Sequence, residues 1–314
     1  MKSSINTIKL IYPPISNRFG GHLWDNNQEV RGYLKQSKLY MLAQRKQLFL
    51  ANHKFNETTQ TLNFSFTCGD TTYNDLSVDL SHYIDTNEET IIELGGEIIK
   101  IYSSDVDTSV EEPTYWATPD KLLWDHSKGR VKIIGDFNPH ELSNFYLYYV
   151  GISKENDSFT RLFKNGHKNR TNILSNEQQF SDSARLSDEI MIFFFDSEEL
   201  RIAQYEVGDD NFLDQTLSDK KDVIADAEKA FIKVLDCKYN KEKYANYPQC
   251  RDGLYNKELS NYSYHIGDDI NFIAPKANIK GRVDIFAKPD YDFIMISGED
   301  VTLFKGEELM DGQT

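Results

Sequence analysis

The sequence predicts an α+β protein, with a small mixed β-sheet flanked by helices and a separate β-rich N-terminal domain. Three segments carry this prediction. Residues 61–67 alternate apolar and polar side chains, which is typical of a half-buried strand. Residues 189–195 are Glu189 followed by six apolar side chains, a continuous run that is typical of a strand buried on both faces. Residues 222–235 repeat apolar side chains at helical spacing, so they predict an amphipathic helix capped by Ser218 or Asp219.

The composition is that of a chain with a substantial core. Of 314 residues, 39% are hydrophobic, and 19 Phe and 18 Tyr supply bulk for the interior. No run of about 18 apolar residues is present, so we expect no transmembrane helix. The N-terminal segment lacks the apolar core of a signal peptide, so a cytoplasmic location is expected. Cys68, Cys237 and Cys250 lack CxxC spacing, and we expect reduced thiols rather than a zinc site.

Residues 1–120 are expected to form the β-rich domain, with a role in recognition, dimerisation or partner contact. Residues 89–102 predict a hairpin across a Gly-Gly turn. Residues 38–51 fit either a pair of strands or a short helix. The polar, acidic stretch 103–113 is typical of a linker, which places the domain boundary before residue 121.

Residues 121–280 are expected to form the second domain. Its segments follow the order strand, strand, basic helix, strand and helix, beginning at residues 130, 145, 159, 189 and 222. The tail, residues 281–314, contains further strand-like runs. We expect it to form a C-terminal β-hairpin extension.

The charge distribution bears on the type of partner. A net charge of −15 argues against a nucleic-acid partner, because nucleic-acid-binding proteins are usually basic at the contact face. The charge is uneven, however. Residues 196–219 hold eight acids and one base, and we expect them to form a solvated loop. Residues 154–170 hold five bases and two acids, so a phosphate would dock there.

A set of chemically capable side chains occurs in a fixed order within residues 131–240. Residues 149–153 read Tyr-Val-Gly-Ile-Ser. Arg161 follows the glycine by ten residues, and His167 comes six residues later. Glu228 lies on the predicted amphipathic helix, beside its apolar stripe, so we expect it to face inward.

Asn240 completes the set after the helix that carries Glu228. The order of these residues resembles that of the GIY-YIG nuclease superfamily over about a third of the chain. The resemblance implies a GIY-YIG-like fold and a metal-dependent endonuclease that hydrolyses the phosphodiester bonds of DNA, double-stranded DNA above all, in restriction or phage defence. It also implies Mg²⁺ or Mn²⁺ as cofactor, and a homodimer or a defence-system protein as partner.

The resemblance assigns a role to each residue. Glu228 would bind the metal, and Arg161 would contact the phosphate. Tyr149 would activate the attacking water, with His167 as a second proton-transfer group. Asn240 would orient groups around the site through neutral hydrogen bonds.

These residue types suit phosphodiester hydrolysis. A hard cation prefers oxygen ligands and keeps several waters, so one carboxylate can anchor it. A guanidinium presents a planar fork to phosphate oxygens. A cation near Tyr149 would lower its pKa and help it to take a proton from water. Lys164, Lys168 and Arg170 fit either a solvated helix face or contacts with a DNA backbone.

The sequence departs from the family at the first name motif. A Gly-Asp-Phe run ends at Phe137, at the expected spacing before Tyr149, so phenylalanine stands in the place of a tyrosine. Phenylalanine neither takes a proton nor donates a hydrogen bond. Tyr146 or Tyr148 could supply the hydroxyl. Alternatively, Tyr149 works with His167, or catalysis is impaired.

Two other functions stay open at this point. An impaired domain would act as a nucleic-acid-binding or protein-interaction module with a nuclease fold. An active domain would cut RNA or modified DNA in place of ordinary DNA. The nuclease hypothesis requires Tyr149, Arg161 and Glu228 to meet at one open cleft.

Overall fold

The computed structural model describes residues 2–84, 89–103, 107–108, 111–164, 166–205, 216–284 and 290–311. The chain is a mixed α+β protein, as the sequence predicts. It divides into two compact units. We call residues 1–45, 143–178 and 186–314 the large unit, and residues 46–142 and 179–185 the inserted unit. No helix in the described part of the chain is long and apolar enough to cross a membrane.

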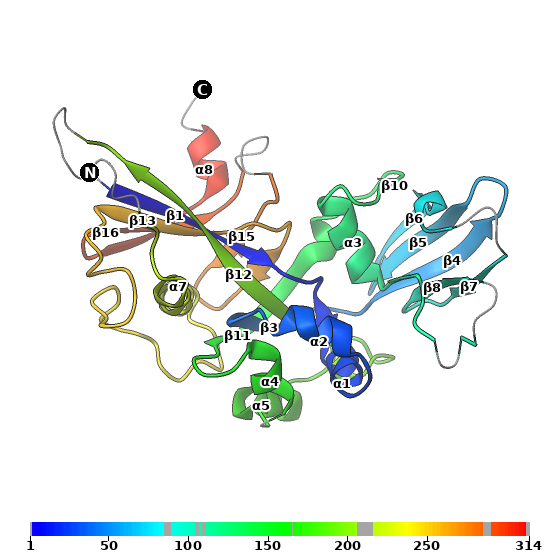
Figure 1. The fold of residues 1–314 in the computed structure, drawn as a ribbon, viewed down its shortest axis with the longest axis horizontal. Coiled ribbons are helices and arrows are strands. Elements are labelled where there is room, and N and C mark those ends of the chain that lie inside the picture. The colour runs from blue at the N-terminus through cyan, green and yellow to red at the C-terminus, as the bar shows by residue number, and fades with distance from the viewer. Residues whose placement is uncertain are drawn as a thin grey trace. The chain divides into compact units, whose positions relative to one another are not determined.

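The large unit is built on one sheet of ten strands (Figure 1). Its order is β15-β14-β11-β3-β12-β1-β13-β16-β17, and β2 pairs with β12 off this path. The expected small sheet is therefore wrong in size, because strands from both ends of the chain join it. The strands are β1 (Lys2–Leu10), β2 (Ile15–Ser16), β3 (Leu39–Gln44), β11 (Asn144–Ile152), β12 (Ile190–Ala203), β13 (Asn261–Ile266), β14 (Asn271–Ile273), β15 (Asn278–Lys280), β16 (Phe293–Ser297) and β17 (Asp300–Phe304).

Strand β12 joins the two halves of this sheet, and its sequence shows why. Residues 190–195 are the continuous apolar run, and all of them are buried where they pair with β3. Residues 196–203 pair with β1 and mostly alternate between the two faces. They form a strand rather than part of the expected solvated loop, because β1 provides a paired neighbour. Residues 206–215 of that acidic run lie outside the described residues.

Helices pack against the large sheet. Helix α7 starts after Asp219, whose side chain accepts a hydrogen bond from the Lys221 N–H, and one of the two expected caps is thus confirmed. Helices α1, α2, α4 and α5 share a core cluster with β3, β11 and β12, in which Tyr40 and Tyr149 take part. The helices of this unit are α1 (Asn17–Asn26), α2 (Gln28–Leu34), α4 (Ser158–Phe163), α5 (Lys168–Asn176), α6 (Leu186–Glu189), α7 (Lys220–Leu235) and α8 (Gly306–Asp311).

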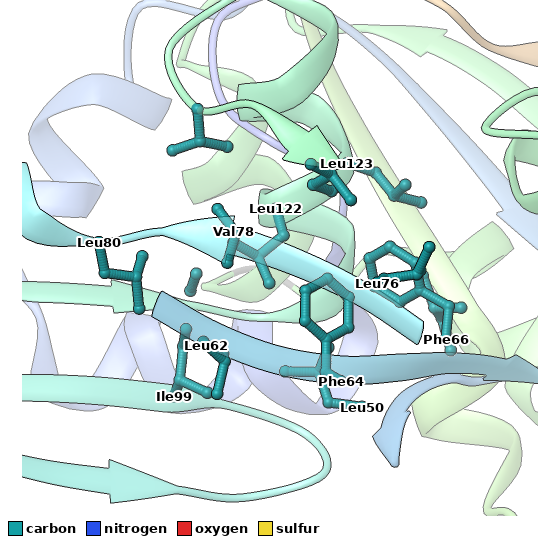
Figure 2. Packing of buried hydrophobic residues seen from close by; sticks show 14 of the residues in the cluster. Leu50, Leu62, Phe64, Phe66, Leu76, Val78, Leu80, Ile99, Leu122 and Leu123 are labelled. Atoms are coloured by element: carbon teal, nitrogen blue, oxygen red, sulfur yellow. The ribbon is translucent and has the colours of Figure 1, made fainter. Parts of the chain in front are cut away.

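The inserted unit contains two smaller sheets, ordered β10-β6-β5-β4 and β7-β8-β9. Figure 2 shows its core, in which Leu62 and Phe64 of β5 pack with Val78 of β6 and Leu122 of α3. The alternation predicted for residues 61–67 places these β5 side chains inward. The elements are β4 (Leu48–Asn56), β5 (Thr61–Cys68), β6 (Thr71–Asp79), η1 (Ser81–Tyr83), β7 (Thr90–Leu94), β8 (Ile99–Ser103), β9 (Tyr115–Ala117), α3 (Pro119–Ser127), β10 (Ile133–Ile134) and η2 (Glu141–Ser143).

The two units divide the chain differently from the expected domains 1–120, 121–280 and 281–314. Residues 1–45 belong to the large unit because β1 and β3 both pair with β12. Residues 103–113, expected as an interdomain linker, connect β8 to β9, which are paired strands. Strands β16 and β17 form the expected C-terminal hairpin, but β16 also pairs with β13 and so belongs to the large sheet.

The inserted unit interrupts a pair of neighbouring strands. The chain leaves the large unit after β3 and returns to it before β11. These two strands pair with each other in antiparallel fashion. Antiparallel neighbours are usually joined by a short turn, and here a folded unit takes the place of that turn.

Candidate active site

Two tyrosines from the neighbouring strands β3 and β11 meet over one glycine. Gly151 lies opposite Tyr40 in the pairing, and Tyr149 lies opposite Leu42. The ring centroids of Tyr40 and Tyr149 are 6.0 Å apart. A Cβ atom on Gly151 would come within 2.5 Å of Tyr149 Cε1 and 2.9 Å of Tyr40 Cζ. Glycine is therefore required for both rings to occupy these positions.

We expect Gly151→Ala to displace one or both rings, because the added methyl group would overlap their atoms. Overpacking of this kind costs about 1–3 kcal/mol, so the free energy of unfolding, measured with urea, should fall by that amount. The matched control is Gly21→Ala on α1, where an added Cβ meets none of the described atoms within 4 Å. Equal losses of stability in the two variants would contradict this packing.

His167 is a neutral hydrogen-bond donor to Tyr40. It is the N-cap of α5, and its Nδ1 accepts the backbone N–H of Arg170 at 3.1 Å. Its Nε2 lies 2.9 Å from Tyr40 Oη. Burial first, and then the charges of Arg161 and Arg170, lower the pKa of His167 to about 4. The proton of the neutral ring is therefore assigned to Nε2, which donates to the phenol oxygen.

We expect His167 to stay neutral, with its proton on Nε2, until the pH falls to about 4. In the unfolded chain the ring takes up its proton near pH 6.5. The stability that His167 contributes is therefore present above about pH 6.5 and is lost as the pH falls towards 4. Nitrogen-15 NMR of the ring, assigned with His167→Gln, measures both the pKa of His167 and the nitrogen that carries its proton. A midpoint near 6.5, or a proton on Nδ1, would contradict the assignment.

Arg161 makes the second contact with Tyr40. Its Nε donates to Tyr40 Oη at 3.2 Å, so this oxygen accepts from both Arg161 and His167. Burial raises the pKa of Tyr40 well above its ordinary value, and Arg161 opposes that rise. Burial is also the largest cause of the raised pKa of Tyr149. The sequence predicts a lowered pKa for Tyr149. In the protein chain by itself, the effect of burial on this pKa is larger than the opposing effect of the Arg161 guanidinium.

Glu228 reaches the same place from α7. It is 9% exposed, in agreement with its position beside the apolar stripe of the helix. It accepts the backbone N–H of Ile152, and its Oε2 lies 3.5 Å from Tyr244 Oη. Burial raises the pKa of Glu228, while Lys229 and then Lys154 oppose the rise. The carboxylate is thus desolvated and would gain from a further positive charge.

Helix α7 and the turn after it also complete the edge of β11. Strand β14 pairs only with the start of that edge, so the later backbone groups need other partners. Asn240 Oδ1 accepts the Val150 N–H at 2.9 Å, and its Nδ2 donates to Val150 O at 2.7 Å. Glu228 takes the Ile152 N–H. Asn240 therefore acts on the site by holding β11, through neutral hydrogen bonds, rather than by lining the pocket.

Arg161, His167 and Glu228 line a pocket of about 580 Å³ in the large unit. Its walls come from the loop after β11, from α4, from the start of α5, from α7 and from Tyr244. Tyr149 interacts electrostatically with both Arg161 and Glu228, which line the pocket. Arg161 and Glu228 therefore share the pocket lining, and Tyr149 lies behind it, close enough to interact with both. Its titratable lining residues besides Tyr244 are Lys154, Glu155, Arg161, His167, Lys168 and Glu228.

The pocket suits a hard cation held by one carboxylate. Among the described residues, no three His, Cys, Asp or Glu side chains are grouped to hold a metal. A cation here would thus depend on Glu228, on waters and on phosphate oxygens. Mg²⁺ keeps several of its waters when it binds, and the pocket has room for them. The residues present fit Mg²⁺ or Mn²⁺ on these grounds.

The basic side chains expected to contact nucleic acid take different positions. Lys168 lines the pocket together with Arg161, and Lys154 joins them from the loop after β11. Lys164 is exposed on the surface and does not belong to the pocket lining. The ammonium and guanidinium groups of the lining are the ones placed to meet a phosphate.

Arg170 has a structural role that differs from the expected contact with a nucleic-acid backbone. Its Nε donates to Asn17 Oδ1, and its Nη1 donates to Leu162 O at 3.1 Å. Its guanidinium also lies 4.3 Å from the ring centroid of Phe163. The group is partly buried, and that burial lowers its pKa. Arg170 therefore ties α5 to α1 and α4 within the large unit.

Phe137 lies in the inserted unit and not in this pocket. It packs against Phe66, with ring centroids 6.1 Å apart. Strand β10, just before it, pairs with β6 rather than with β11. Tyr146 is 49% exposed, and Tyr148 donates a hydrogen bond to Gln44, so neither lines the pocket. Phe137 therefore does not occupy the position expected for the first motif, because it lies outside any strand and the nearby β10 pairs with β6.

Tyr40 is the site residue that the sequence analysis missed. Its strand reads Leu-Tyr-Met-Leu-Ala-Gln, which has the composition of a buried strand. That signal is weak because many strands share it. The pairing of β3 with β11 identifies Tyr40, and the inserted unit separates those strands along the chain.

Comparison of the chain with protein-family models, with curated proteins and with solved structures finds no match. Its function is therefore inferred from the pocket. Cationic groups beside a buried carboxylate suit the binding of an anion together with a metal ion. Two adjacent phenols add groups that can move a proton.

Proposed function

We propose that the large unit is a metal-dependent endonuclease that hydrolyses phosphodiester bonds in DNA by GIY-YIG-type chemistry. The observation that carries the proposal is that Arg161, His167 and Glu228 line one pocket, while Tyr149 lies close enough to interact with Arg161 and Glu228. They come from β11, α4, the N-cap of α5 and α7. The convergence of side chains from four separate elements on this region supports the nuclease hypothesis.

Tyr40 strengthens the resemblance to the family. Residues 38–40 read Lys-Leu-Tyr, and β3 pairs with β11, which carries Tyr149-Val150-Gly151. The first name motif is thus best placed at Tyr40, on the strand beside the second. With a tyrosine in each motif, Phe137 is no longer a reason to expect impaired catalysis.

The cations of the pocket would bind the scissile phosphate. Arg161 uses its Nε on Tyr40, which fixes the plane of its guanidinium. Its remaining N–H donors are available for non-bridging phosphate oxygens. Lys154 and Lys168 line the same pocket and add positive charge. This arrangement favours a phosphate at the level of Arg161, within reach of Glu228.

The Glu228 carboxylate and the two phenols would have separate roles in the reaction. Mg²⁺ held by Glu228 would supply charge that stabilises the phosphate and the leaving oxygen. Tyr149 is 7% exposed and Tyr40 is fully buried, so of the two phenols Tyr149 is the one that an attacking water would reach. Tyr40 orients Arg161 and His167. His167 is a neutral donor near pH 7 and so is not the proton acceptor.

The distribution of charge between the units is compatible with a DNA substrate. Residues 46–142 hold 17 acids and seven bases. Most of the net charge of −15 therefore belongs to the inserted unit rather than to the unit with the pocket. Local charge governs the contact with a phosphate. A restriction or defence role, and a homodimer or partner protein, stay predictions of the resemblance.

A cleavage assay tests this function. The full chain is incubated with supercoiled plasmid, linear duplex, single-stranded DNA and RNA, each with Mg²⁺, with Mn²⁺ or with EDTA. We expect metal-dependent cleavage of duplex DNA. Cleavage of RNA alone would move the proposal to that substrate. Binding of DNA without cleavage of any substrate would favour the interaction-module alternative.

A further inference from the structure

The loop after α7 brings a second aromatic residue to the candidate metal ligand. Tyr244 lines the pocket, and its Oη lies 3.5 Å from Glu228 Oε2. No family motif pointed to it. It follows Asn240 by four residues, on the far side of the turn that holds β11. Its ring is half-buried at the pocket wall.

The backbone at Tyr244 is in a conformation that bulky residues rarely adopt. Its φ is +46°, in the left-handed region that favours glycine. Neighbouring contacts hold it there. Lys243 Nζ donates to Cys237 O at 2.7 Å, and the Tyr247 N–H donates to Tyr244 O at 2.9 Å. Strain of this kind persists where surrounding structure imposes it, and it gathers at functional sites.

The hydroxyl of Tyr244 is a donor to the carboxylate. A phenol keeps its proton at neutral pH. A carboxylate only accepts hydrogen bonds, so the proton lies on the tyrosine. Glu228 therefore accepts from the Ile152 N–H and has the Tyr244 hydroxyl as a second, longer donor at 3.5 Å. Together they restrict the rotation of the carboxylate within the pocket.

We propose that Tyr244 is a positioning residue that orients the Glu228 carboxylate for a divalent cation. This inference rests on the proposed function, since Glu228 is the metal ligand only in that hypothesis. Carboxylates that bind metals are commonly held by hydrogen bonds from outside the coordination sphere, and loss of such a partner lowers metal affinity about 10–100-fold. The strained backbone places the Tyr244 hydroxyl in that position.

Mn²⁺ binding to the full chain, followed by electron paramagnetic resonance without any nucleic acid, tests the role. We expect Tyr244→Phe to weaken Mn²⁺ binding about 10–100-fold, with an unchanged melting temperature, because it keeps both ring and backbone. Tyr244→Gly, which relieves the positive φ, should weaken binding to the same extent. Tyr146→Phe is the control, since Tyr146 is 49% exposed and does not line the pocket.

The possible results distinguish the positioning role of Tyr244 from the metal site itself. If wild type binds Mn²⁺, Glu228→Gln does not and Tyr244→Phe binds like wild type, the positioning role is wrong and the metal site stands. If only Tyr244→Gly weakens binding, the ring acts and the hydroxyl does not, which also overturns the role. If wild type itself binds no Mn²⁺, the titration is repeated with inorganic phosphate, because phosphate oxygens would complete the site. No binding there either would overturn the metal-dependent function, and this inference with it.

Discussion

Replacement of Glu228 by glutamine is expected to lower metal-dependent cleavage by at least about a thousandfold. The metal contributes several kcal/mol of stabilisation to such a transition state, and each 1.36 kcal/mol is tenfold in rate. Glutamine keeps the shape of the side chain and an oxygen for the Ile152 N–H. The loss should therefore come from the missing charge rather than from unfolding. Initial rates across a Mg²⁺ titration, with thermal denaturation beside them, measure both.

Glu155→Gln is the matched control for Glu228. Glu155 also lines the pocket, but it is exposed and lies in the loop after β11. An exposed carboxylate is already stabilised by water, so a cation gains little by binding to it. We therefore expect Glu155→Gln to change the cleavage rate at most several-fold. If Glu155→Gln abolished cleavage and Glu228→Gln did not, the metal ligand would be Glu155. The pocket would then still be the active site, with Glu155 as its metal ligand.

Tyr149→Phe is expected to lower the rate of the chemical step by about 10²–10⁴, the range for loss of a positioned acid or base. The variant keeps the ring over Gly151, so the packing against Tyr40 should survive. Single-turnover cleavage at saturating enzyme isolates this step from binding. The fall should be seen in that rate and not in the affinity for DNA.

Tyr148→Phe is the control for Tyr149. The residue is adjacent on β11, and its hydroxyl donates to Gln44 Oε1 at 2.8 Å, away from the pocket. Each variant removes one phenol hydroxyl from the same strand, which costs about 1 kcal/mol of stability for a typical hydrogen bond. Equal rates for the two variants would show that Tyr149 takes no part in the chemistry. Tyr40→Phe would then be the next phenol to test.

The local parts of this fold are readable in the sequence. Apolar spacing predicts helix α7. Of the two N-cap residues that the sequence offers, the structure uses Asp219. Period-two alternation predicts β5 and its inward face. The same local logic places Glu228 beside the apolar stripe, and the structure buries it at the pocket. These features depend on residues within a few positions of one another, so a short window contains the information.

The partner of each strand is not contained in such a window. The apolar strand that carries Tyr40 resembles many others, and only its pairing with β11 brings Tyr40 to Gly151. Phe137 had the expected spacing, but it follows β10, which pairs with β6 and not with β11. A folded unit between β3 and β11 makes their contact distant in sequence. Pairing is selected by burial of whole faces across the sheet, which spacing alone does not encode.

The same distinction between local sequence and tertiary contacts applies to the roles of the side chains in the site. The order of Tyr149, Arg161, His167 and Glu228 along the chain is a property of the sequence. Tertiary contacts decide what each side chain does: the Arg170 N–H keeps the proton of His167 on the nitrogen that faces Tyr40. The positive φ of Tyr244 is likewise imposed by its surroundings, since tyrosine does not favour it. Local propensity selects the elements, while long-range burial and hydrogen bonding select the partners that make a site.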